Sequence, residues 1–433
     1  MCNNLDMNLA ERDIQSIWHP YTQMKTAALP IPIVRGEGAL LFDENGNEYI
    51  DAISSWWVNV HGHSHPYIAE KVYEQFKTLE HVIFAGFTHP KAVELAERLL
   101  KKLPENQNRV FFSDNGSTAV EVALKMALQY WHNKGEKRIN ILAIDGAYHG
   151  DTFGAMAVSG RSAFTAAFDD LLFDVIHLPF PEKNGETTIQ HLKSQISSRF
   201  NQDKSQISCF IFEPLVQGAA GMRMYSPEVL QEMISICREN NIITIADEVM
   251  TGFGRTGKFF ATDYISENPD IFCLSKGLTG GTMAFGITSC SSKIYDTFFS
   301  DDKMKTFFHG HSFTANPVAC AASCASLDLF EEQETWENIS RIEQSHCEFA
   351  EKIRRNDLVE DICQQGTILA IELKTGEETS YFNSIRDNAY DFFIKRGVLL
   401  RPLGNVIYVL PPYCITEVQL AKVYEVIEEF LGS

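Results

Sequence analysis

Ile242-Ile-Thr-Ile-Ala-Asp247 and Ile271-Phe-Cys-Leu-Ser-Lys276 are two short apolar runs, and each ends in one ionisable residue. Apolar runs rich in β-branched residues are typical of parallel strands that are buried on both faces. The carboxyl ends of such strands meet at one edge of a sheet. We therefore expect Asp247 and Lys276 to face a common site.

The chemistry of these two side chains favours one cofactor. A lysine can form a Schiff base with an aldehyde when burial or a nearby cation lowers its pKa from about 10.4 towards neutrality. An aspartate across the same cleft can keep a pyridinium nitrogen protonated. Lys276 and Asp247 together would make pyridoxal phosphate an electron sink. From these strands alone, an alternative stays open in which Asp247 caps a turn and Lys276 is solvated.

Composition narrows the class of protein. With 433 residues, 45% of them apolar, the chain can bury one large core and a smaller one. The net charge of -20 argues against nucleic acid or an acidic membrane surface as the main partner and favours small-molecule chemistry. The first residues lack the basic start and apolar core of a signal peptide, and no apolar run approaches the roughly 18 residues of a membrane span. We expect a cytoplasmic protein that does not bind a membrane.

Strand and helix patterns alternate between residues 67 and 289, which predicts a doubly wound α/β domain. A long helical pattern after Asn316-Pro317 leads into three short strands and a closing helix, which predicts a smaller α+β domain. We divide the chain into an N-terminal segment (1–65) that joins the small domain, a large domain (66–318) and a C-terminal small domain (319–433). The predicted strands of the large domain are 109–113, 140–145, 173–178, 208–213, 241–247, 271–275 and 284–290.

Two glycine-containing stretches are candidate phosphate sites. In Phe111-Phe-Ser-Asp-Asn-Gly116-Ser117, a strand ends at a polar turn and Ser117 caps a helix, so the helix N-terminus can bind an anion. Gly252-Phe-Gly-Arg-Thr-Gly257 matches G-x-G-x-x-G, but it does not follow its strand directly and no amphipathic helix follows it. A Walker loop is also disfavoured because Phe259 replaces the hydroxyl residue that binds magnesium.

Histidine and tryptophan clusters raise further hypotheses. His61-Gly-His-Ser-His65 and His309-Gly-His311 invite a metal site, but turn residues separate the histidines and no carboxylate or cysteine lies beside them at ligand spacing. We therefore predict no metal. Ser54-Ser-Trp-Trp57 is interpreted as an extended segment, whose adjacent tryptophans point to opposite faces. At most one of them would then line a given cleft.

Longer motifs carry a resemblance to a known family. They are Trp18-His-Pro-Tyr-Thr, Ser54-Ser-Trp-Trp, Asp114-Asn-Gly-Ser-Thr-Ala-Val-Glu, Tyr148-His-Gly-Asp-Thr-Phe-Gly-Ala-Met, Ala246-Asp-Glu, Gly252-Phe-Gly-Arg-Thr-Gly-Lys, Leu278-Thr-Gly-Gly-Thr-Met and Arg401-Pro-Leu-Gly-Asn. Over nearly its whole length the chain resembles the class III aminotransferases, which depend on pyridoxal phosphate. The resemblance implies fold type I, with a seven-stranded, mostly parallel sheet in the large domain.

The resemblance also implies a cofactor site. Lys276 would form the Schiff base and Asp247 would meet the pyridine nitrogen, as the strand argument already suggests. Gly116 and Ser117 would bind the phosphate, and Tyr148 would stack on the ring. A loop of the neighbouring subunit, Gly310-His311-Ser312, would complete the phosphate site, so the resemblance implies a homodimer. Many relatives have Gly-Pro-Thr in that loop; His311 and Ser312 depart from this pattern, which leaves the role of His311 open.

Within the family, the chain is most similar to members that use S-adenosylmethionine to aminate 8-amino-7-oxononanoate in biotin biosynthesis. That acceptor has a long aliphatic chain and a terminal carboxylate, so its site needs an apolar channel closed by a cation. Tyr21, Trp56 and Tyr148 would form the channel and Arg401 would bind the carboxylate. Tyr21 would also stack on the donor's adenine and act with Lys276 and Asp247 in catalysis. Lys276 and Gly310 would also contact the substrate.

Arg255 is a plausible second substrate contact. Three alternative functions stay open. An ornithine- or 4-aminobutyrate-type enzyme shares the fold, but such relatives have a gating glutamate where this chain has Ala219, and they lack the tryptophan pair. The same acceptor can be paired with lysine as the donor. A non-catalytic binding protein of this fold is disfavoured because Lys276 and Asp247 are intact.

Overall fold

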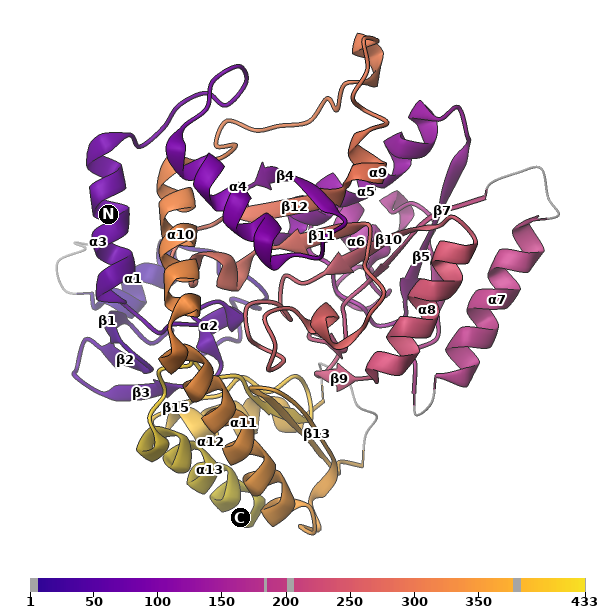
Figure 1. Ribbon diagram of the computed structural model, residues 1–433. Helices are drawn as coiled ribbons and strands as arrows, with labels where there is room; N and C mark the ends of the chain where they lie inside the picture. The colour runs from indigo at the N-terminus through magenta and orange to yellow at the C-terminus, as the bar shows by residue number, and fades with distance from the viewer. Residues whose placement is uncertain (1–6, 183–184, 201–205, 377–382, 433) are drawn as a thin grey trace.

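A mixed sheet of seven strands, in the order β4-β12-β11-β10-β7-β5-β6, lies in the larger part of the chain (Figure 1). The computed structural model describes residues 7–182, 185–200, 206–376 and 383–432. Strand β12 is antiparallel to its neighbours β11 and β4, and the other neighbouring pairs are parallel. The predicted seven-stranded, mostly parallel sheet is confirmed. Its strands are β4 (Gln107–Ser113), β5 (Arg138–Ile144), β6 (Ile176–Leu178), β7 (Gln206–Phe212), β10 (Ile243–Asp247), β11 (Ile271–Leu274) and β12 (Gly286–Ser291).

Helices cover both faces of this sheet because its strands are apolar on both sides. Ile243 and Ile245 pack in one cluster with helix α5, whereas Phe210 and Phe212 belong to a second cluster on the opposite face, with α4, α7 and α8. Successive strand residues therefore supply two cores. The helices of the larger part are α3 (Pro66–Thr78), α4 (Pro90–Lys102), α5 (Gly116–Asn133), α6 (Phe153–Val158), α7 (Glu186–Phe200), α8 (Pro227–Glu239), α9 (Ser292–Tyr295) and α10 (Pro317–Glu331).

Two smaller sheets lie outside the large one, and one of them joins the N-terminal and C-terminal parts of the chain. The order β1-β2-β3-β15 brings a strand from the C-terminal part beside the N-terminal hairpins, and β13-β14-β16 form a second antiparallel sheet. The N-terminal segment thus contacts the C-terminal part, although boundaries at residues 65 and 318 stay a prediction. The elements are α1 (Leu9–Ser16), β1 (Ile33–Glu37), β2 (Leu40–Asp43), β3 (Glu48–Asp51), α2 (Ser54–Trp57), α11 (Gln333–Ile353), β13 (Val359–Gln365), β14 (Ile368–Leu373), α12 (Ile385–Ile394), β15 (Val398–Leu399), β16 (Val406–Val409) and α13 (Glu417–Gly432).

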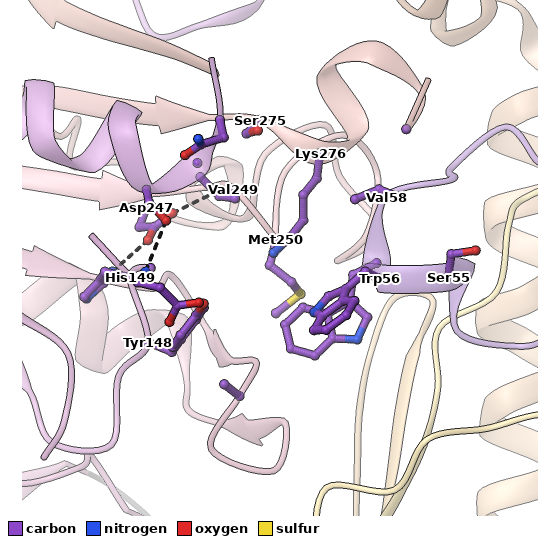
Figure 2. Close-up of a pocket in the computed structure, with 18 of the residues that line it drawn as sticks. Ser55, Trp56, Val58, Tyr148, His149, Asp247, Val249, Met250, Ser275 and Lys276 are labelled. Atoms are coloured by element: carbon purple, nitrogen blue, oxygen red, sulfur yellow. Dashed lines mark hydrogen bonds and ion pairs between the residues drawn. The ribbon is translucent and has the colours of Figure 1, made fainter. Parts of the chain in front are cut away.

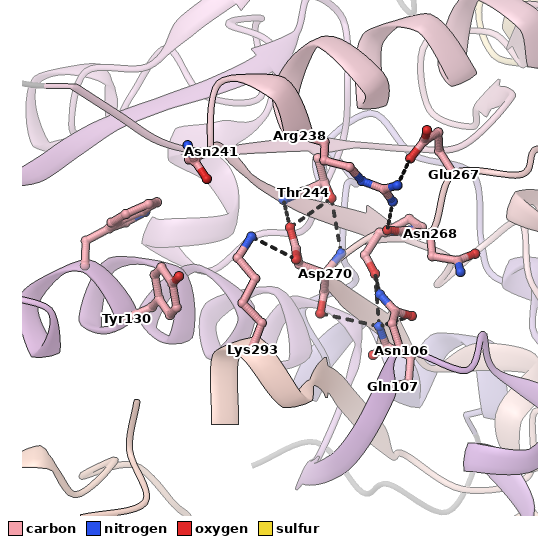
Figure 3. Close-up of polar contacts among 12 residues, drawn as sticks. Asn106, Gln107, Tyr130, Arg238, Asn241, Thr244, Glu267, Asn268, Asp270 and Lys293 are labelled. Atoms are coloured by element: carbon pink, nitrogen blue, oxygen red, sulfur yellow. Dashed lines mark hydrogen bonds and ion pairs between the residues drawn. The ribbon is translucent and has the colours of Figure 1, made fainter. Parts of the chain in front are cut away.

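Polar contacts at the amino ends of the central strands help to set their register (Figure 3). The Asp270 carboxylate accepts hydrogen bonds from the Thr244 backbone and hydroxyl, at 3.0 and 3.3 Å, and from Lys293 at 3.3 Å. Gln107 donates to the Pro269 carbonyl at 3.0 Å. These contacts join β4, β10 and β11 at the edge of the sheet that lies opposite Asp247.

Several features differ from the sequence-based prediction. Helices α1, α7 and α12, strand β13 and the short hairpin β8 (Val216–Gln217) with β9 (Arg223–Met224) were not predicted. Single 3-10 turns also occur at η1 (Asp169–Leu171), η2 (Ala261–Tyr264), η3 (Lys276–Thr279) and η4 (Lys303–Lys305).

Within the described ranges, no helix combines the length and apolar character needed to cross a bilayer. The first six residues, on which the expectation of no signal peptide rests, lie outside the described residues.

One glycine lets the turn between β13 and β14 contact the 252–257 loop. Gly366 has φ +56°, and a Cβ there would lie 2.2 Å from the backbone carbon of Thr256. Gly46 has φ +84°, but a Cβ there would meet nothing within 4 Å. A residue with a side chain would be strained at both positions, and at position 366 its Cβ would also collide with backbone atoms.

We expect Gly366→Ala to lower the free energy of unfolding by about 2 kcal/mol more than Gly46→Ala, because overpacking against backbone adds to the shared conformational strain. Urea unfolding of the two variants, followed by circular dichroism, measures the difference. Equal losses in the two variants would contradict the close approach.

Candidate active site

Asp247 and Lys276 lie at the carboxyl ends of neighbouring parallel strands. In the register of β10 and β11, Asp247 is paired with Cys273, and Lys276 follows β11 as the first residue of η3. Lys276 has φ 46°, a left-handed conformation that turns its side chain out of the strand direction. Figure 2 shows Asp247 and His149 on one side of Lys276 and Trp56 on the other. The predicted meeting of the two residues at one site is confirmed.

Both residues line a cavity of about 740 Å³. Most of the predicted site residues line it with them. These are Tyr21, Trp56, Gly116, Ser117, Tyr148 and Arg401. In this single chain, the predicted residues Gly310, His311 and Ser312 are not among those that line the cavity.

His149 holds the Asp247 carboxylate in place. Its Nδ1 lies 2.7 Å from Asp247 Oδ2, and because a carboxylate only accepts, the histidine donates. Asp247 Oδ1 also accepts from the Val249 backbone N–H at 3.1 Å. Asp247 therefore both caps a turn and faces the cavity. Sequence reasoning missed His149, although it follows Tyr148 directly in a motif that carried the family resemblance.

Lys276 is held in a state suited to nucleophilic attack. Burial lowers the pKa of Lys276 to about 8, although Asp247 and Glu213 act in the opposite direction. Its Nζ lies 4.9 Å from the centre of the Trp57 ring. A substantial fraction of the amine is therefore neutral near physiological pH, as a Schiff-base lysine requires.

Glu213 is a cavity-lining carboxyl to which the sequence reasoning assigned no role here. Its two oxygens accept from the backbone N–H groups of Tyr148 and Gly218, at 3.0 and 3.1 Å. Burial raises the pKa of Glu213 to about 7, and the nearby Asp247 adds to the shift. The carboxyl thus joins the segment that carries Tyr148 to the segment beside Trp57. Its position at the end of β7 follows the same strand-tip pattern as Asp247, and that pattern could have revealed it.

The start of helix α5 lies at the cavity and is suited to bind an anion. Asn115 caps the helix by accepting from the Thr118 N–H at 3.0 Å, which leaves the first N–H groups of α5 directed outward. A Cβ at Gly116 would lie 2.7 Å from Val249, and a Cβ at Gly150 would lie 2.1 Å from Ser117 Oγ. Glycine at both positions therefore lets the helix start, the segment after Asp247 and the segment after Tyr148 approach one another closely.

The Ser54–Trp57 segment is a tight turn, so the prediction of an extended segment there was wrong. Ser54, Ser55 and Trp57 have positive φ angles of 51°, 57° and 67°. The turn brings both Trp56 and Trp57 to the cavity, which also corrects the expectation that at most one would line it. Trp57 Nε1 donates to the Tyr408 hydroxyl at 3.0 Å.

Tyr21 and Tyr148 form an aromatic wall with Trp56. The Tyr21 ring centre is 5.8 Å from that of Trp56, and its hydroxyl is 3.3 Å from the Tyr148 hydroxyl. Tyr21 also donates to the Asp151 carboxylate, a contact that sequence reasoning missed. Burial raises the pKa of Tyr148, so its phenol stays protonated.

The two arginines predicted to bind substrate differ in their surroundings. Arg401 lines the cavity, and its guanidinium carbon is 5.0 Å from the Trp56 ring centre. Within the described part of the chain it forms no ion pair. Arg255 is 1% exposed and donates to the carbonyls of Pro411 and Trp57. Arg255 does not line the cavity, so the expectation that it contacts the substrate was wrong; two of its nitrogens donate to backbone carbonyls, and its Nε has no hydrogen-bond partner among the described residues.

No group of three or more metal-ligating side chains occurs among the residues described. His61 is buried and its Nε2 lies 3.1 Å from the Ser326 hydroxyl, and burial lowers the pKa of His61 to about 3. His63 lies 2.8 Å from the Asp51 carboxylate. These histidines are partners of other protein groups.

Comparison with known proteins identifies the family. The model of the family described as aminotransferase class-III matches residues 21–431. The chain belongs to the class III aminotransferases. It is 49% identical to the adenosylmethionine-8-amino-7-oxononanoate aminotransferase of Synechococcus elongatus, over 96% of this chain and 98% of that protein. The family uses pyridoxal phosphate, and solved members include a Pseudomonas transaminase in the form bound to it.

Solved structures agree with this assignment. The crystal structure of the adenosylmethionine-8-amino-7-oxononanoate aminotransferase of Methanocaldococcus jannaschii matches with a TM-score of 0.91 and 36% identity, over 97% of this chain and 98% of that one. An omega transaminase of Pseudomonas jessenii in complex with PMP matches with a TM-score of 0.90 and 26% identity, over 98% of both chains. The expected fold type of this class is thereby confirmed.

The cavity fits the cofactor of the family. The Lys276 amine, with a pKa of about 8, suits the cofactor's aldehyde. The Asp247 carboxylate, which His149 fixes, suits the ring nitrogen, and the N-terminus of α5 suits the phosphate.

We expect the rate at which the apoprotein binds pyridoxal phosphate to rise with pH and to reach half of its maximum near pH 8, since only the neutral Lys276 amine attacks the aldehyde. Glu213→Gln removes a negative charge that favours the protonated amine, so the midpoint should move to lower pH. Stopped-flow absorbance over pH 6 to 10 measures both midpoints.

Glu248 provides a matched control. It is a buried carboxyl whose pKa burial raises to about 7, but it does not line the cavity. Glu248→Gln should leave the midpoint unchanged. A wild-type midpoint near the ordinary lysine value, or the same shift in both variants, would contradict the electrostatic account of the site.

Proposed function

We propose that the protein transfers an amino group from S-adenosylmethionine to 8-amino-7-oxononanoate and so makes 7,8-diaminononanoate for biotin biosynthesis. The names of its relatives support this proposal, since they combine that donor and that acceptor. The observation that carries it is the combination of a cavity of about 740 Å³, a wall of aromatic rings and an arginine without an acidic partner among the described residues.

Arg401 is suited to the far end of the acceptor. A cation that lines a cavity and lacks a protein carboxylate can bind one from a ligand, and a guanidinium does so with two parallel hydrogen bonds. The rings of Tyr21, Trp56 and Tyr148 would contact the aliphatic chain, and Tyr21 would also stack on the adenine of the donor. Apolar walls with one charged end match an ω-carboxylate ketone.

The protein's own groups divide the work of the reaction. When bound, pyridoxal phosphate supplies an aldehyde that accepts the amino group and a ring that withdraws electrons. Lys276 would bind the aldehyde, and after displacement by the donor its free amine would move the proton at the reacting carbon. Asp247, oriented by His149, would keep the ring nitrogen protonated. The N-terminal N–H groups of α5 at Gly116 and Ser117 would bind the phosphate.

We further propose a homodimer in the cytoplasm. Gly310, His311 and Ser312 do not line the cavity of their own chain, and the neighbouring Phe308 and Phe313 are 73% and 62% exposed. An exposed apolar loop of this kind is suited to contact a second copy, whose phosphate site it would complete. Cysteines in the described chain are free, as in a reducing compartment. The charge of -20 disfavours nucleic acid as a partner.

We expect Lys276→Ala to abolish amino transfer and the visible absorbance of the lysine-bound cofactor, because no other described amine lines the cavity near Asp247. Spectra and product assays of the purified variant measure the two effects. Full amino transfer by this variant would overturn the proposal.

Arg401→Met should raise the KM for 8-amino-7-oxononanoate by about 10- to 100-fold, the range expected for hydrogen bonds to a charged group. Steady-state kinetics measure this KM. Arg401→Lys keeps the charge but loses the paired donors, so its KM should lie between those of the wild type and of Arg401→Met.

The amino donor is tested separately. The holoenzyme is mixed with S-adenosylmethionine, with lysine or with ornithine, each time without acceptor. We expect only S-adenosylmethionine to convert the cofactor absorbance to that of the aminated form. If lysine converts the cofactor and S-adenosylmethionine does not, 8-amino-7-oxononanoate would remain the proposed acceptor and lysine would be the donor.

A further inference from the structure

The histidine-rich stretch at residues 61–65 contains one histidine with a role that the proposed chemistry does not use. His63 Nδ1 lies 2.9 Å from the Asn59 side-chain nitrogen, and Nε2 lies 2.8 Å from Asp51 Oδ2. Because the amide nitrogen donates, Nδ1 accepts, and the proton on Nε2 is donated to the carboxylate. The Asp51 side chain is 0% exposed. A buried carboxylate without such donors would be costly.

Asp51 in turn holds the turn that carries the tryptophans. Its Oδ1 accepts from the backbone N–H groups of Ile53 and Ser55, at 3.2 and 2.9 Å, and its Oδ2 accepts from the Ser55 hydroxyl at 3.0 Å. The turn includes Ser54 and Ser55 with positive φ angles of 51° and 57°. Such conformations cost about 1–3 kcal/mol each and persist only where surrounding contacts impose them. The Asp51 carboxylate supplies those contacts.

The end of strand β3 also positions Arg401. Asp51 is paired with Leu399 in the parallel β3–β15 contact, and the Ala52 N–H donates to the Leu399 carbonyl at 3.2 Å. Arg401 follows two residues after Leu399, and its guanidinium carbon lies 5.0 Å from the Trp56 ring centre. Trp56 is thus connected to Asp51 through the turn, and Arg401 is connected to the same residue through the sheet.

We propose that Asp51 and His63 are positioning residues that fix Trp56 relative to Arg401 and so set the selectivity for ketones with a terminal carboxylate. This inference rests on the proposed function, in which Arg401 binds that carboxylate. A paired contact from a guanidinium requires a defined approach, and the Trp56 ring beside it limits the direction from which the acceptor enters. His63 acts through Asp51 and does not line the cavity itself.

The test compares the acceptor 8-amino-7-oxononanoate with its terminal amide, which has the same length and no charge. The measured quantity is the ratio of kcat/KM for the acid to kcat/KM for the amide. His63→Leu removes the donor to Asp51 and should lower this ratio about tenfold, because an ångström of misplacement at a positioning contact can cost up to about a hundredfold. His63→Gln can still donate to Asp51 and should keep most of the ratio.

A buried histidine elsewhere is the control for stability. His346 lies 2.7 Å from the Tyr424 hydroxyl and 3.1 Å from the Thr367 carbonyl, and it is 0% exposed. His346→Leu should lower the thermal midpoint and leave the acid-to-amide ratio unchanged. The visible spectrum of the bound cofactor should be unchanged in both His63 variants, since His63 does not contact the Asp247 end.

Arg401→Met separates the two proposals. If it lowers the ratio and His63→Leu does not, the positioning role is overturned and the proposed function stands. If Arg401→Met leaves the ratio unchanged, carboxylate binding by Arg401 is itself overturned. If His346→Leu lowers the ratio as much as His63→Leu, the effect is one of general stability and the positioning role is rejected.

Discussion

The register between strands β10 and β11 is the constraint on which the rest of the site depends. Because the strands are parallel and buried on both faces, a charged side chain is tolerated only where each strand ends. Pairing of Asp247 with Cys273 brings the carboxylate and Lys276 to the same edge. A shift by one residue would exchange the faces of the strand and place Ile245 against the wrong core. The polar contacts of Asp270 at the opposite ends of the strands oppose such a shift.

Burial gives the site its electrostatic character. It lowers the pKa of Lys276 to about 8 and raises that of Glu213 to about 7, so both groups titrate near physiological pH. Their charges also influence each other, because an ionised Glu213 favours the protonated lysine. His149 donates a hydrogen bond to Asp247 and so fixes the orientation of its carboxylate. The Lys276 amine and the Glu213 carboxyl can therefore exchange a proton with little change in free energy.

The aromatic wall of the cavity depends on backbone strain as much as on side-chain identity. Lys276 and residues of the Ser54–Trp57 turn adopt a left-handed backbone conformation, which is rare for residues other than glycine. Asp51 supplies the hydrogen bonds that hold the turn, and Arg255 donates to the Trp57 carbonyl from the other side. The aromatic wall is therefore supported by residues that do not themselves line the cavity.

The sequence by itself determined the seven strands, the class of fold, and the presence of Asp247, Lys276 and Gly116 at strand or helix ends, because apolar periodicity and turn residues are local signals. Its main errors involve contacts between distant segments. The turn at Trp56 is held by the nearby Asp51 but also by Arg255, 198 residues from Trp57, and the buried role of Arg255 depends on Pro411, 156 residues away. The contacts of His149 and of Asp151 likewise form only when distant segments meet. Tertiary structure decided these features, since no local pattern specifies which distant carbonyl or carboxylate a side chain will contact.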